Sequence, residues 1–130
     1  GPPSVMRFEQ VPRPTLGPGE VLLKIAAAAV GPWDGWIRAG TSALPQPLPL
    51  TLGSDFSGDV VAVGRGVDQW REGEQVYGVT NRRFVGAYAE YAVASAAMIA
   101  EKPASLSYIE AASVPVVAVA AWQALFDQAH

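Results

Sequence analysis

Residues 52–64 read LGSDFSGDVVAVG, and the second half of this stretch is almost wholly apolar and rich in valine. Valine-rich runs of this length that are bounded by glycine are typical of a largely buried strand. We therefore predict a strand over residues 55–64. Gly58 lies inside it, and a glycine within a strand often marks a bulge or the close approach of a second backbone.

Further short strands are predicted on both sides of this one. Residues 21–30 read VLLKIAAAAV, which suits a mostly buried strand, although the four alanines also favour helix. Residues 75–79, 86–93 and 98–100 are interpreted as three more strands, and residues 67–74 as a polar turn. Several short strands separated by turns are typical of a small β-barrel.

Prolines define the segments that are neither strand nor long helix. Residues 1–20 carry five prolines, a spacing that excludes helix and favours extended backbone broken by turns. Residues 44–50 have proline at every second position, so this segment is predicted as loop or polyproline II. Residues 33–39 are predicted as one short helical turn that Gly40 ends.

The last quarter of the chain is predicted to be helical. Ser107 and Glu110 form a capping-box pattern ahead of an apolar segment. Pro115 either kinks this helix or starts a second one that runs to about Asp127. The predicted fold class is mainly β, a small β-barrel with C-terminal helices.

The composition excludes several kinds of site and partner. The 130 residues include no cysteine and a single histidine, His130, at the end of the chain. Zinc sites depend on thiolates and imidazoles, so we expect no metal, and a Cys nucleophile is excluded. A Ser-His-Asp triad would have to take its base from the last residue. The net charge of −3 and the lack of a basic run disfavour a nucleic-acid partner.

Neither an export signal nor a phosphate-binding loop is found in the sequence. Residues 1–4 lack the basic start and apolar core of a signal peptide, and the longest uncharged run, residues 111–126, is shorter than the ~20 residues that a spanning helix needs. We expect a cytoplasmic protein with no membrane partner. No G-x-G-x-x-G sequence or Walker loop occurs, so the usual pyrophosphate cradle is missing.

Four stretches in order resemble the zinc-free quinone oxidoreductases of the medium-chain dehydrogenase/reductase superfamily. They are residues 12–24, 30–40, 52–64 with 73–78, and 86–91 with 121–126. The resemblance implies that residues 1–130 form the GroES-like domain that precedes a Rossmann domain in that family. It also implies a chain truncated at both ends, without the family's first strand and without the Rossmann domain.

The resemblance also assigns candidate site residues. The segment that lines the nicotinamide and substrate cleft in the family corresponds here to the cofactor-binding candidates Pro32, Trp33, Asp34, Gly35 and Trp36. Ala120 joins them, at a position where the family often has a threonine that reaches the cofactor. The substrate candidates are Trp33, Trp36, Ser54 and Asp55. No catalytic acid is identified, so the proton is expected to come from solvent.

Structural roles compete with several of these assignments. The alternative role for Trp33 and Trp36 is packing in the core or against a missing domain. Ser54 and Asp55 stand where zinc alcohol dehydrogenases have His and Glu, and this replacement argues against zinc catalysis. Asp55 would equally be a structural residue at a strand start, and a loop serine such as Ser54 commonly bonds nearby backbone. Residues 81–83 read as a solvated loop, with a role in holding substrate as the minority interpretation.

The function implied by the resemblance is reduction of quinones or α,β-unsaturated carbonyls with NADPH, without zinc, by a full-length homodimer. A 2-enoyl-thioester reductase of the same superfamily is one alternative. A non-catalytic GroES-like scaffold or interaction module is the other. The 130 residues alone are expected to be inactive, because they lack a phosphate cradle.

Overall fold

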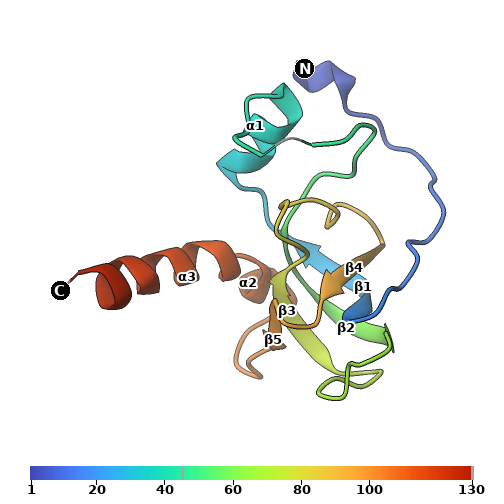
Figure 1. The fold of residues 1–130 in the computed structure, drawn as a ribbon, viewed down its shortest axis with the longest axis vertical. Helices are drawn as coiled ribbons and strands as arrows, with labels where there is room; N and C mark the ends of the chain where they lie inside the picture. The colour runs from blue at the N-terminus through green and yellow to red at the C-terminus, as the bar shows by residue number, and fades with distance from the viewer. Residues whose placement is uncertain (45, 130) are drawn as a thin grey trace.

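The computed structural model describes residues 1–44 and 46–129, and its centre is one antiparallel sheet (Figure 1). The strands are β1 (Glu20–Ala28), β2 (Asp55–Val63), β3 (Gln75–Val79), β4 (Tyr91–Ser95) and β5 (Ile99–Glu101). Their order across the sheet is β4-β1-β2-β3-β5, and the described strand pairs are all antiparallel. The described residues therefore contain no parallel, Rossmann-type sheet.

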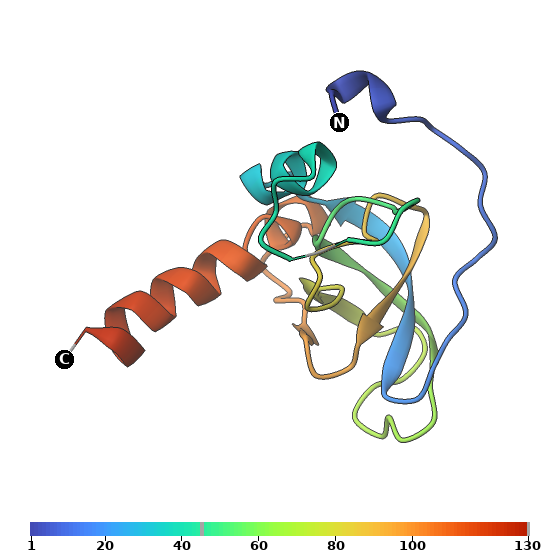
Figure 2. The same ribbon diagram turned by 45° about the horizontal axis from the view of Figure 1, so that its top comes forward.

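The sheet curls until strands from its two sides meet. The N–H of Ser95, at the end of edge strand β4, donates to the carbonyl of Thr80 beyond β3 at 3.0 Å. Figure 2 shows the resulting curvature around a common interior. The interior is filled by small and medium apolar side chains: Val21, Leu23, Phe56, Val60, Val67, Val76, Ala87, Ala94 and Ala96. The predicted mainly β fold is confirmed.

Gly58 lies where β1 and β2 approach each other most closely. A Cβ atom at this position would lie 2.2 Å from the backbone oxygen of Lys24. The register of β1 against β2 shifts between Ile25 and Ala27, beside the partner of Gly58. The bulge and close approach that the sequence predicted here are both present.

Gly58→Ala is expected to lower the free energy of unfolding by about 1–3 kcal/mol, because backbone rather than a movable side chain blocks the added methyl. Urea denaturation followed by circular dichroism measures the change. Gly35→Ala is the matched control, since a Cβ at Gly35 meets nothing within 4 Å. In helix α1 that control should be neutral or stabilising by up to about 1 kcal/mol. Equal losses in the two variants would contradict the explanation.

The helices begin at the residues that the sequence marks. Helix α1 (Pro32–Ala39) has proline at its first position and ends before Gly40. Helix α2 (Tyr108–Ala112) is capped by Ser107 and Glu110, as predicted. Pro115 starts a second helix rather than kinking the first: α3 (Pro115–Trp122) continues as the π-helical turn η2 (Gln123–Gln128).

Helix α3 projects away from the sheet (Figure 1). Most of its apolar side chains are exposed. Trp122, Leu125 and Phe126 in α3 and η2 are each more than 60% exposed. No helix within the described residues is both long and apolar enough to cross a membrane.

Two of the predicted strands need correction. Only the end of the predicted strand 86–93 is a strand, since β4 starts at Tyr91. Residues 86–88 instead donate backbone hydrogen bonds to the carbonyls of residues 51–53, which draws this segment out of the sheet. The first strand ends at Ala28 rather than at residue 30.

The exclusion of helix from residues 1–20 was wrong at its start, where residues 3–5 form the short 3₁₀ helix η1 (Pro3–Val5). Proline is tolerated in a first helical turn, because its missing N–H would have no partner there. Of the predicted loop 44–50, residues 44 and 46–50 contain no helix or strand, and Pro45 lies outside the described residues. His130, the residue on which a triad would have depended, also lies outside them.

Candidate functional site

A buried carboxylate, Asp34, joins the start of α1 to two distant loops. Its side chain is 4% exposed. Its Oδ2 accepts the N–H of Gly31 at 2.8 Å and the hydroxyl of Tyr88 at 2.9 Å. Its Oδ1 accepts the N–H of Gly53 at 3.2 Å. Three donors thus satisfy one buried carboxylate and fix α1 against the loop that leads into β2.

Tyr88 completes this cluster from the segment before β4. Its hydroxyl also lies 3.2 Å from the carbonyl oxygen of Ala29. Burial, and then the hydrogen bond and negative charge of Asp34, raise the pKa of Tyr88 well above its usual range. Gly53 allows the tyrosine ring to lie close, because a Cβ there would come within 2.2 Å of the ring. Tyr88 therefore stays protonated and donates to Asp34.

A second chain of hydrogen bonds runs from Trp33 to helix α3. The indole N–H of Trp33 donates to Ser54 Oγ at 2.9 Å. The Ser54 hydroxyl donates to Asp55 Oδ2 at 2.6 Å. The N–H of Val116, in the first turn of α3, donates to Asp55 Oδ1 at 2.8 Å. Ser54 and Asp55 are almost fully buried, so this chain positions α3 relative to α1.

The structure brings most of the sequence-predicted residues together and separates the roles of the two tryptophans. Trp33 is half-buried, bonded to Ser54, and packs edge-on against Phe84 with ring centroids 6.4 Å apart. Trp36 is 57% exposed on α1. Pro32 is exposed and Gly35 half-buried on the same helix, while Ala120 lies exposed on α3. Whether these residues contact a cofactor stays a prediction.

Sequence reasoning missed the partner of Asp34. Tyr88 is 54 residues away in the chain, and nothing in residues 86–91 marks its hydroxyl as a partner of α1. Phe84 was also missed; its φ is +60°, which is unusual for a residue other than glycine. Nothing in residues 81–86, which read NRRFVG, marks Phe84 as a partner of Trp33.

The donor groups of this region do not form a metal site. No group of three or more His, Cys, Asp or Glu side chains within residues 1–44 and 46–129 could hold an ion. Ser54 Oγ accepts the indole N–H of Trp33 with one lone pair and donates its proton to Asp55.

The sequence of this chain matches a known family as well. The family model of the alcohol dehydrogenase GroES-like domain matches residues 17–104. The chain belongs to this family. The GroES-like fold that the sequence predicted is confirmed.

Relatives of the domain are described as oxidoreductases. The chain is 36% identical to the chloroplastic quinone-oxidoreductase homolog of Spinacia oleracea, over 100% of this chain and 40% of the relative. It is 36% identical to the 2-methylene-furan-3-one reductase of Solanum lycopersicum, over 96% of this chain and 34% of the relative. The chain thus spans no more than about 40% of the length of these relatives.

A solved structure agrees with the fold and with a nicotinamide cofactor in the family. The quinone oxidoreductase of Escherichia coli complexed with NADPH superposes with a TM-score of 0.88 at 26% identity. The match covers 97% of this chain and 38% of that one. The chain is therefore similar to about two fifths of longer proteins that are described as quinone oxidoreductases or their homologs.

Proposed function

We propose that this domain is part of an NADPH-dependent reductase of quinones or α,β-unsaturated carbonyls that works without zinc. The observation that carries the proposal is the Trp33–Ser54–Asp55 chain. These hydrogen bonds hold the indole of Trp33, rather than a metal ligand, at the start of α1. The relatives described as a quinone-oxidoreductase homolog and a 2-methylene-furan-3-one reductase support the substrate class.

The residues at the start of α1 fit the nicotinamide end of the cofactor. The exposed indole of Trp36 and the exposed ring of Pro32 offer a flat, apolar surface against which a planar ring can stack. The sequence offers no glycine-rich cradle for the phosphates. We infer that the phosphates are held by a second, nucleotide-binding domain.

A bound nicotinamide would supply the hydride, and this chain would orient the rings and exclude water. Asp34 holds α1 in place through its three hydrogen bonds. The Ser54 and Tyr88 hydroxyls direct their protons at Asp55 and Asp34. Neither hydroxyl is poised to protonate a product, so the proton is assigned to solvent.

The decisive assay uses a protein that carries this chain together with a nucleotide-binding domain. We expect it to oxidise NADPH when a quinone or an enone is added, and a metal chelator should leave the rate unchanged. Trp36→Ala should lower kcat/KM by about tenfold, through lost stacking. A protein that binds NADPH but reduces neither class would contradict the substrate assignment. A protein that binds no nucleotide would favour the scaffold alternative.

Residues 1–130 alone should not bind NADPH tightly. Most of the affinity for a dinucleotide comes from pyrophosphate and ribose contacts, whereas this domain offers only the surface around Trp33 and Trp36. Titration with NADPH, followed by tryptophan fluorescence, should show no saturation at micromolar cofactor. Saturable quenching in that range would show that the barrel carries a nucleotide site of its own.

The cytoplasmic location also remains part of the proposal. The spinach relative is described as chloroplastic. Fractionation of the source cells, with detection by an antibody against this domain, tests the prediction.

A further inference from the structure

The extended segment that precedes β1 has no partner for its backbone. Residues 1–15 are all exposed. Within the described part of the chain, residues 7–16 neither donate nor accept a backbone hydrogen bond. Figures 1 and 2 both show the segment running outside the sheet rather than along one of its edges. Extended backbone with free N–H and C=O groups is a template for pairing with another strand.

Both ends of this segment are held to the rest of the domain. At one end, Arg38 Nε on α1 donates to the carbonyl of Gly1 at 3.3 Å. At the other end, the guanidinium of Arg13 stacks on the ring of Tyr91, 3.7 Å from the ring centroid. Because both ends are fixed, the residues between them lose less conformational entropy when they pair with a strand.

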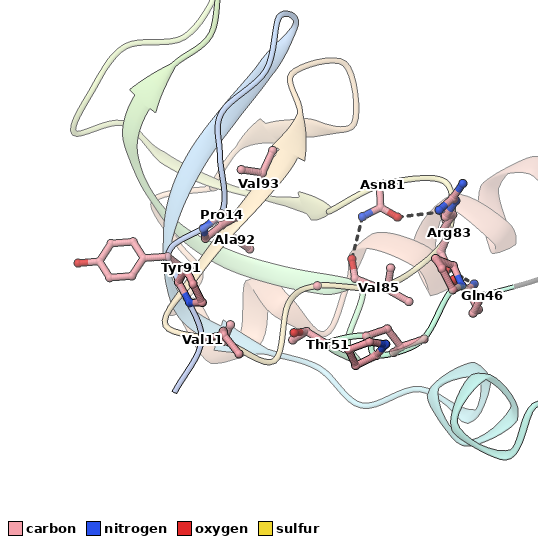
Figure 3. Close-up of a pocket in the computed structure, with 16 residues that line it drawn as sticks. Val11, Pro14, Gln46, Thr51, Asn81, Arg83, Val85, Tyr91, Ala92 and Val93 are labelled. Carbon is pink, nitrogen blue, oxygen red and sulfur yellow. Dashed lines mark hydrogen bonds between the residues drawn. The ribbon is translucent and has the colours of Figure 1, made fainter. Parts of the chain in front are cut away.

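The segment also forms one wall of a pocket of about 350 Å³ on the barrel (Figure 3). Val11 and Pro14 lie on this wall, and Gln46 lines another part of the pocket. The segment therefore touches the barrel through side chains, and its backbone groups stay free.

Residues 5–11 read VMRFEQV, with a charged residue on either side of Phe8. In an extended chain, successive side chains point to opposite faces. The two faces of this segment hold Val5, Arg7, Glu9 and Val11, and Met6, Phe8 and Gln10. The apolar side chains of both faces are each more than half exposed, and that of Phe8 is fully exposed. The segment thus offers apolar surface together with unpaired backbone.

This sequence is complementary to itself when two copies run antiparallel with Phe8 opposite Phe8. Arg7 then lies opposite Glu9 of the second copy, and Glu9 lies opposite Arg7 of the second copy. Val5 lies opposite Val11, and the two phenylalanines meet at the two-fold axis. Aromatic, β-branched and opposite-charge pairs are the cross-strand pairs that stabilise antiparallel strands.

The neighbouring registers are disfavoured by charge. Sliding one strand by two residues places Arg7 opposite Arg7, or Glu9 opposite Glu9, and like charges directly opposite each other are destabilising. Sliding it by one residue places the Phe8 ring opposite a charged side chain. The charges therefore select the register that is centred on Phe8.

From this arrangement we propose that residues 5–11 pair antiparallel with the same residues of a second copy of the chain, about a two-fold axis at Phe8. The contact is isologous, because each copy contributes the same surface. A single strand pair buries less than the roughly 1,200–2,000 Å² of a stable interface, so the dimer is weak and forms at high concentration. The proposal uses none of the residues to which the reductase function is assigned, and it does not depend on that function.

Disulfide trapping tests the position of the axis, because the chain has no cysteine of its own. In Phe8→Cys the two thiols lie opposite each other, within the roughly 4.4–6.8 Å between Cα atoms that a disulfide needs. Val11→Cys is the matched control: Val11 is also exposed, but its two copies are about 20 Å apart along the strands. Under mild oxidation, Phe8→Cys should form disulfide-linked dimers at least about tenfold faster. Equal rates for the two variants would overturn the proposal.

Charge reversals test the register, with sedimentation velocity of the 130-residue chain from micromolar to millimolar concentration as the measurement. Arg7→Glu and Glu9→Arg should each weaken dimerisation by about tenfold, because two-fold symmetry repeats every charge pair. The double variant exchanges the two charges and should restore dimerisation to within about threefold. Arg65→Glu reverses an exposed charge outside the segment and should change it by no more than about twofold.

Two results of the sedimentation experiment would refute the strand pairing. One is a chain that stays monomeric up to millimolar concentration. The other is a dimer that forms equally well in both single charge variants, which would assign the contact to another surface, such as the exposed apolar side chains of α3.

Discussion

Asp34→Ala is expected to lower the free energy of unfolding by about 3–5 kcal/mol, a large share of the stability of a domain of this size. The substitution leaves the N–H groups of Gly31 and Gly53 without their acceptor, and the Tyr88 hydroxyl keeps only its contact with the carbonyl of Ala29. Gly53 is buried and Gly31 is partly buried, so the bonds lost by their N–H groups are not readily replaced by water. Urea denaturation at neutral pH, followed by tryptophan fluorescence, measures the loss.

Two further variants test whether the loss of stability comes from the Asp34 carboxylate itself. Tyr88→Phe removes one donor and leaves Asp34 with two backbone N–H groups, so it should cost only about 1 kcal/mol. Asp68→Ala removes an exposed carboxylate and should change stability by less than about 0.5 kcal/mol. A loss for Asp34→Ala no greater than that for Asp68→Ala would show that the three bonds do not hold α1 in place.

Local signals in the sequence were enough for most of the fold. The valine-rich run after Asp55 became β2, and Gly58 marked the point where β1 comes close. The Ser107–Glu110 pattern capped α2, because a cap depends only on residues within one turn. The prediction of a strand was wrong for residues 86–88, because the tertiary fold sets their hydrogen-bond partners, residues 51–53. An alternating pattern carries no information about such partners.

The site was less predictable than the fold, for the same physical reason. The resemblance placed Trp33, Ser54 and Asp55 in one region, and the structure joins them by hydrogen bonds. It did not show that Tyr88 bonds Asp34, since 54 residues separate the two and neither lies in a recognisable spacing. The pocket beside Gln46 was also missed, because four segments far apart in the sequence form it.

Asp55 was left between a structural and a substrate-binding role, and its contacts favour the first. Pro115 has no N–H, so Val116 carries the first free N–H of α3, and Asp55 accepts it at 2.8 Å. A carboxylate at this position also interacts favourably with the positive end of the α3 helix dipole. The second oxygen of Asp55 is engaged by Ser54. Both oxygens thus have partners within the domain, and the carboxylate is 3% exposed.

Asp55→Ala is accordingly expected to cost about 2–4 kcal/mol, from a lost cap and an unpaired Ser54 hydroxyl. Amide hydrogen exchange should show the loss first in α3, at Val116 and Ala118. Asp55→Asn keeps an oxygen for Val116 and should cost about half as much. In a protein that carries the nucleotide-binding domain, Asp55→Asn should also retain kcat, because on this account the charge touches no substrate. A kcat that falls with the Asn variant while stability is preserved would instead place Asp55 in contact with the reacting molecule.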